Sequence, residues 1–204
     1  MAILQRQTYI NDIVNRLSGL ASNVKLRGLL NLLGLHVISE DFYVGLLNLI
    51  FGWKLRNANS LQQNAKGIDL VDDSNHILVQ VTGTSTKRKI DHSLEEIPEK
   101  YTGYHFYFAP IVIDAKEQRK YKYAPPYEVV FNPKTDILDI HFITDRIKEM
   151  LDIESIGTIA MFIKNNIPND VPDTTQLASG LNYIICQLAE DDLNECDFDM
   201  TEFE

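Results

Sequence analysis

Residues 67–82, GIDLVDDSNHILVQVT, carry the pattern from which we predict the fold of this chain. Two apolar runs, Ile68–Val71 and Ile77–Thr82, flank a polar segment whose Asp, Ser and Asn residues favour a tight turn. We therefore expect an antiparallel hairpin. Since alternate residues of a strand share a face, Gln80 and Thr82 should point to one side of the sheet and the intervening valines to the other.

Asp69 stands alone between apolar neighbours in the first of these strands. An isolated buried carboxylate is costly unless it has a partner, and a divalent cation is one such partner. Nearby backbone amides are the alternative. Gln80, eleven residues later, is either a ligand through its side-chain oxygen or a buried amide that bridges the strands.

Helices are expected ahead of the hairpin. Apolar residues recur every three or four positions over 4–35, which predicts two helices with a break near Ser22. Ser39 is a plausible N-cap for a third helix through Phe51, which would place Glu40 in its first turn. Glu40 is then either a helix-dipole acid or a third ligand. A short strand over 53–57 and a loop should follow.

After the hairpin the pattern remains that of an α/β protein. Thr86 is expected to cap a helix over 87–101, and the apolar and aromatic residues over 104–113 predict a buried strand. The remaining elements are a strand over 137–143 and helices over 144–151, 156–165 and 175–188.

Composition limits the class of protein. The chain has 204 residues, which suits one α/β domain over 1–167 and a helical, acidic extension over 168–204. Its two cysteines make a zinc site or disulfide scaffold unexpected. The net charge of −10 argues against a protein that coats nucleic acid, although 116–122 is locally basic. Without a signal peptide or a long apolar run, we expect a cytoplasmic protein and no membrane partner.

A helix acid, a strand Asp and a strand (Asp/Glu/Gln)-x-Lys form the pattern of the PD-(D/E)xK nucleases, which Glu40, Asp69 and Gln80 resemble. The stretch GIDLVDDSNHILVQVTGTSTKRKIDHSL, residues 67–94, is similar to the central segment of SMEK-type domains found in bacterial conflict and antiphage systems. The resemblance implies an α/β fold with a restriction-endonuclease-like central mixed sheet flanked by helices, preceded by N-terminal helices. It also implies protein partners encoded nearby, or a homo-oligomer.

The chemistry that this resemblance implies is metal-dependent hydrolysis of a phosphodiester, with DNA as the expected substrate. Asp69, Glu40, the side-chain oxygen of Gln80 and the carbonyl of Val81 would hold Mg²⁺ or Mn²⁺. The metal would polarise the phosphate and acidify a water molecule.

The lysine of the motif should lie two residues after Gln80, where this sequence has Thr82. Lys87 is the first substitute that we expect to act in catalysis, with Lys89 and Lys66 as alternatives. The opposing hypothesis is a catalytically inactive nuclease-like module that serves in binding or in assembly with partner proteins.

Overall fold

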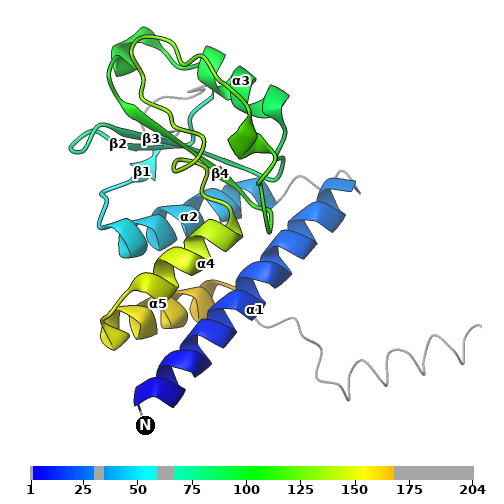
Figure 1. Cartoon of the computed structure of the whole chain (residues 1–204), viewed down its shortest axis with the longest axis vertical. Helices are drawn as coiled ribbons and strands as arrows, with labels where there is room; N and C mark the ends of the chain where they lie inside the picture. The colour runs from blue at the N-terminus through cyan, green and yellow to red at the C-terminus, as the bar shows by residue number, and fades with distance from the viewer. Residues whose placement is uncertain (1, 30–34, 59–66, 168–204) are drawn as a thin grey trace, which may run out of the picture. The chain divides into compact units, whose positions relative to one another are not determined.

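The computed structural model describes residues 2–29, 35–58 and 67–167, which all belong to the compact unit Met1–Pro168. This unit is a mixed α/β fold with a four-stranded sheet and helices on both of its faces (Figure 1). Most of the predicted loop before Gly67 and the whole of the predicted extension over 168–204 lie outside the described residues.

The sheet has the strand order β1-β2-β3-β4. Its strands are β1 (Arg56–Asn57), β2 (Leu70–Asp72), β3 (Ile77–Thr82) and β4 (His105–Pro110). β2 and β3 are antiparallel, which confirms the predicted hairpin, whereas β4 runs parallel to β3. A parallel neighbour requires a crossover connection, and α3 lies in that connection.

Helix α3 (Lys87–Glu95) starts where the sequence predicts. The Thr86 hydroxyl accepts a hydrogen bond from the Lys89 N–H at 3.2 Å, which confirms it as the N-cap. The helix ends earlier than expected, because Pro98 follows and disfavours continuation of the α-helix. The short 3₁₀ turn η2 (Glu99–Tyr101) takes up the remainder of the predicted range.

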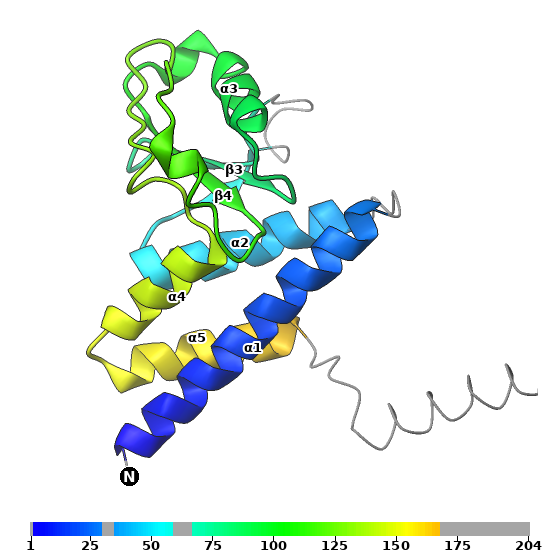
Figure 2. The same cartoon turned by 45° about the vertical axis from the view of Figure 1, so that its right-hand side comes forward.

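The alternation of β3 divides the apolar core between the two faces of the sheet. Val79 belongs to the core shared with helices α1, α2, α4 and α5, and Leu78 belongs to the core shared with Ile90 and Leu94 of α3. Figure 2 shows α3 and α2 on opposite sides of the strands. Gln80 has the same parity as Leu78, so it faces the side of the sheet that α3 covers.

Two N-terminal predictions are wrong in their boundaries. Helix α1 (Ala2–Leu29) continues through Ser22, whose hydroxyl donates to the carbonyl four residues back at 2.9 Å and is thereby satisfied inside the helix. Helix α2 (Leu35–Phe51) begins ahead of Ser39, so Ser39 is not its N-cap and Glu40 lies beyond its first turn.

Helix α4 (Ile140–Glu149) occupies much of the range 137–143 for which the sequence predicts a strand, so that prediction is wrong. The cause is Asp139, which accepts from the Phe142 N–H at 2.8 Å and caps a helix at that point. Helix α5 (Ile153–Asn166) packs against α1 and α2. Within the described ranges, no helix combines the length and the hydropathy needed to span a bilayer.

Candidate functional site

Asp69 immediately precedes β2, and its backbone is held from both sides. Its N–H donates to the Val79 carbonyl at 3.0 Å, and its own carbonyl accepts from the Ala58 N–H at 2.7 Å. Its Oδ2 accepts from the Gln80 side-chain amide at 2.5 Å and from the Val81 N–H at 2.8 Å. The sheet register therefore brings Asp69 and Gln80 side by side, as the predicted site requires.

The orientation of the Gln80 amide is the second feature of this site. Its Nε2 donates both to Asp69 Oδ2 and to the Val81 carbonyl, the latter at 3.2 Å, and the residue is only 6% exposed. The amide nitrogen thus lies between two of the oxygens expected to bind a cation. The Gln80 oxygen could join those two as a ligand only after the amide rotates.

Asp69 has an unusual proton affinity. Burial raises its pKa to about 7, against the hydrogen bond from the Val81 N–H. The charge of Glu40 raises the pKa further, whereas the charge of Lys89 and the Gln80 hydrogen bond lower it. Among the described residues, no cationic side chain forms an ion pair with Asp69. The carboxyl therefore exchanges its proton near neutral pH.

Glu40 reaches the same region from α2. Its Oε2 accepts from the side-chain amide of Asn57 at 3.1 Å, and Asn57 pairs with Leu70, the residue after Asp69. Sequence reasoning missed Asn57, because nothing in a polar segment marks one amide among several. In the described parts of the chain, no three His, Cys, Asp or Glu side chains gather as a preformed metal site.

Lys89 lies on the side of α3 that faces the segment leading to Asp69. Gly67, with φ of +76°, passes so close to the helix that a Cβ there would lie 2.9 Å from the Ser93 carbonyl. Ser93 is four residues after Lys89, so the two share one side of the helix. Lys89 is half-buried and makes no ion pair within the described ranges.

Lys87 is held on the other flank of α3. Side chains two positions apart in a helix point about 200° apart, so Lys87 and Lys89 lie on different sides of α3. The Lys87 ammonium donates to Asp91 at 2.5 Å and lies 5.3 Å from the centre of the Tyr123 ring. This geometry favours Lys89 over Lys87 as the cation that acts on Asp69. Lys66, the third alternative, lies outside the described residues.

Thr82, at the position of the motif's lysine, has a structural role at the end of β3. It is 8% exposed, and its hydroxyl accepts from the Thr84 N–H at 3.2 Å. Its carbonyl accepts from the Ile111 N–H at 2.7 Å. These contacts hold the turn that leads into α3. The positive charge that the lysine of the motif supplies must therefore come from a residue other than Thr82.

Comparison with known proteins places this sequence in a family. A family model described as the SMEK domain matches residues 12–148, a range that begins in α1, ends in α4 and includes every described site residue from Glu40 to Lys89. No curated protein and no solved structure matches the chain. The match covers more than half of the sequence, and the chain therefore belongs to the SMEK domain family.

Proposed function

We propose that this domain is a PD-(D/E)xK-like nuclease that hydrolyses DNA phosphodiesters with Mg²⁺ or Mn²⁺ held at Asp69. The observation that carries the proposal is the half-buried Asp69 carboxylate, which has a pKa raised to about 7 and no ion-pair partner among the described residues. Perturbed groups of this kind concentrate at functional sites. A mixed sheet with helices on both faces is consistent with the restriction-endonuclease-like architecture that the sequence motif implies.

The residues present fit a divalent ion in part. Asp69 and the Val81 carbonyl already converge, and rotation of the Gln80 amide adds a third oxygen. Glu40 becomes available as a fourth if it leaves Asn57. A single close carboxylate with neutral oxygens predicts weak binding, because affinity follows the charge and number of ligands.

Each group has a definite part in the proposed reaction. When bound, the ion would polarise the phosphate and acidify a water molecule. The Asp69 carboxylate and the Val81 carbonyl would hold the ion, and Lys89 would balance the negative charge that develops on the phosphate. The Lys87 role expected from the sequence remains a prediction, although the contacts of Lys87 with Asp91 and Tyr123 hold it elsewhere.

A second function is favoured by one specific observation. The Gln80 Nε2 occupies the place between Asp69 and Val81 that a cation would need. Its two hydrogen bonds satisfy the Asp69 carboxylate and the Val81 carbonyl without any metal. An inactive nuclease-like module, used for binding or assembly with partner proteins of a bacterial defence system, would have such a closed site.

Two measurements separate these functions. Plasmid cleavage with Mg²⁺ or Mn²⁺ is compared between wild type, Asp69→Asn and Asp145→Asn, which alters a half-exposed carboxylate on α4 and serves as the matched control. Binding of Mn²⁺ is measured by calorimetry on the same proteins. A nuclease loses both cleavage and Mn²⁺ binding in Asp69→Asn alone.

The inactive module predicts a different result. Wild type would then neither cleave DNA nor bind Mn²⁺, and Asp69→Asn would behave in the same way. Cleavage that persists in Asp69→Asn would place the activity at a different site and overturn the proposal.

A further inference from the structure

A cavity of about 820 Å³ lies along α3, on the same helix that brings Lys89 toward Asp69. Its described lining consists of the N-cap Thr86 and side chains of α3. Three consecutive cations, Lys87, Arg88 and Lys89, line its N-terminal end, and acidic side chains line it further along. The N-terminal end of this described lining is therefore positive, and it includes Lys89, whose charge acts on Asp69.

The three cations differ in how much charge they can offer to a ligand. Lys87 shares its charge with Asp91 at 2.5 Å. Lys89 is half-buried, and its charge acts on Asp69. Arg88 is exposed and has no ion pair with any described acid, so its guanidinium remains available to an anion.

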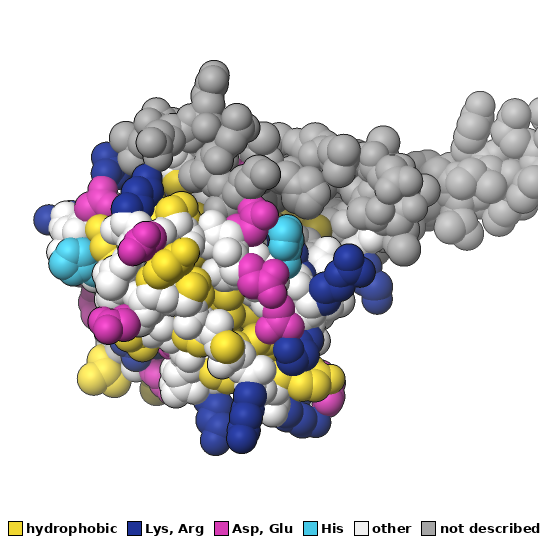
Figure 3. All heavy atoms as spheres, turned by 90° about the horizontal axis from the view of Figure 1, so that it is seen from above, with side chains coloured by type: hydrophobic (Ala, Val, Ile, Leu, Met, Phe, Trp, Pro, Cys, Tyr) yellow, Lys and Arg dark blue, Asp and Glu magenta, His cyan; other side chains and the backbone are white. Residues whose placement is uncertain are grey.

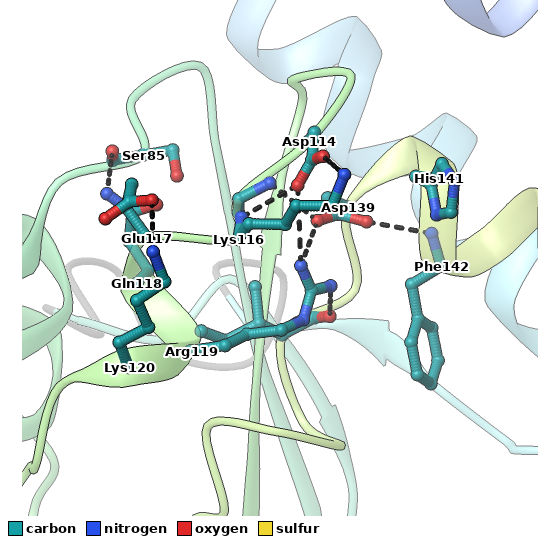
Figure 4. A network of polar contacts seen from close by, with 12 residues as sticks. Ser85, Asp114, Lys116, Glu117, Gln118, Arg119, Lys120, Asp139, His141 and Phe142 are labelled. Atoms are coloured by element: carbon teal, nitrogen blue, oxygen red, sulfur yellow. Dashed lines mark hydrogen bonds and ion pairs between the residues drawn. The ribbon is translucent and has the colours of Figure 1, made fainter.

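Other basic residues near this helix are mostly balanced by acids. In Figure 4, Lys116 pairs with Asp114 and Arg119 reaches Asp139, while Lys120 pairs with Glu117. The segment 116–122 is thus less cationic than its sequence indicates. In Figure 3, Lys and Arg side chains are spread around the face seen from above, with acidic side chains among them. On this face a polyanion would therefore meet separate cationic side chains and not a broad basic surface.

We propose that the N-terminal end of α3 binds the phosphodiester backbone of a nucleic acid strand through Arg88 and Lys87, and so presents the strand to Lys89 and Asp69. This inference rests on the proposed function and names the surface by which its substrate is held. Contacts of this kind position the backbone without reading its sequence. Affinity should therefore depend on salt and be nearly independent of base sequence.

The acids on the same helix limit where the strand can run. Asp91 and Glu95 follow the cations by one and two turns and line the same cavity. A second phosphate there would meet like charge. The strand must therefore cross α3 near Arg88 and not follow its length.

The test uses the full-length protein, EDTA and a short fluorescein-labelled oligonucleotide, both single-stranded and as a duplex, with anisotropy recorded over a range of salt concentrations. Arg88→Ala should weaken binding by about threefold to tenfold and reduce the salt slope by about one. Asp91→Asn should strengthen binding, because it removes a negative charge and frees Lys87.

Arg146→Ala is the matched control, since Arg146 is an exposed arginine on α4 with 50% of its side chain accessible. The proposal is overturned if wild type does not bind the oligonucleotide at low salt. It is also overturned if Arg88→Ala binds as Arg146→Ala does, or if polyglutamate competes as well as the unlabelled oligonucleotide. Because EDTA removes divalent ions, failure of the nuclease proposal would appear separately, as binding without cleavage.

Discussion

Asp69 is half-buried and Asp139 is fully buried, and the two carboxylates differ in what balances their charge. Asp139 is 0% exposed and accepts from the Phe142 and Ala115 N–H groups and, at 2.6 Å, from the Arg119 guanidinium. Asp69 accepts from one backbone N–H and one amide. A buried carboxylate with a full set of donors and a cation serves the fold, whereas one without a cation has capacity left for a ligand.

The largest expected effect concerns Asp139, the carboxylate whose charge is balanced by Arg119. Asp139→Ala should lower the free energy of unfolding by about 3–5 kcal/mol, because Arg119 loses its carboxylate and α4 loses its N-cap. Urea unfolding followed by circular dichroism measures it. The Asp145→Ala variant, which alters a half-exposed side chain on the same helix, should change stability by less than about 0.5 kcal/mol. Equal losses in the two variants would show that the Asp139 network contributes nothing special.

The second effect concerns the pH dependence of stability in metal-free protein. Because folding raises the Asp69 pKa from 3.8 to about 7, the folded state binds the proton more tightly, and its stability falls as pH rises between these values. The Asp69→Asn variant has no carboxyl at this position, so it does not lose stability in this way as pH rises. Its stability relative to wild type should therefore increase from pH 4 to pH 8, by at most about 4 kcal/mol. A difference that stays constant with pH would contradict the raised pKa.

A third effect tests whether the Gln80 amide closes the site. Gln80→Glu replaces the amide donor with a second carboxylate, so it should bind Mn²⁺ more tightly than wild type. At ten times its dissociation constant, Mn²⁺ should stabilise this variant by about 1.4 kcal/mol in thermal unfolding. Gln118→Glu, which alters a glutamine bonded to the Ser85 carbonyl instead, is the control. No gain over that control would mean that the amide is not what excludes the ion.

The smallest effect compares the two lysines of α3. Lys89→Ala should raise the pKa of Asp69, because the positive charge of Lys89 now lowers it. Lys87→Ala should leave it unchanged, since Lys87 is paired with Asp91 on the other flank. Carbon-detected NMR titration of the Asp69 carboxyl measures both. If Lys87→Ala raised the pKa of Asp69 more than Lys89→Ala did, Lys87 would again be the preferred cation.

Short-range patterns determined a large part of this site. The period of two along β3 and the turn residues before it predicted the hairpin, and the observed register opposes Leu70 to Val79. In this register Asp69, the residue before Leu70, lies opposite Gln80, the residue after Val79, so the two are neighbours. Thr86 was likewise identifiable as an N-cap, because capping depends on residues within one turn.

Other features of the site depend on contacts between residues far apart in the chain, which local patterns do not predict. Asp139 starts α4 in a segment that alternates like a strand, and Arg119, twenty residues away, stabilises it there. The close approach of Gly67 to α3 gives Lys89 its place beside the site, which helical spacing alone leaves open between two lysines. Sequence patterns report local periodicity, whereas the packing of α3 on the sheet brings the charge of Lys89 to act on Asp69, and contacts with Asp69 and Val81 orient the Gln80 amide.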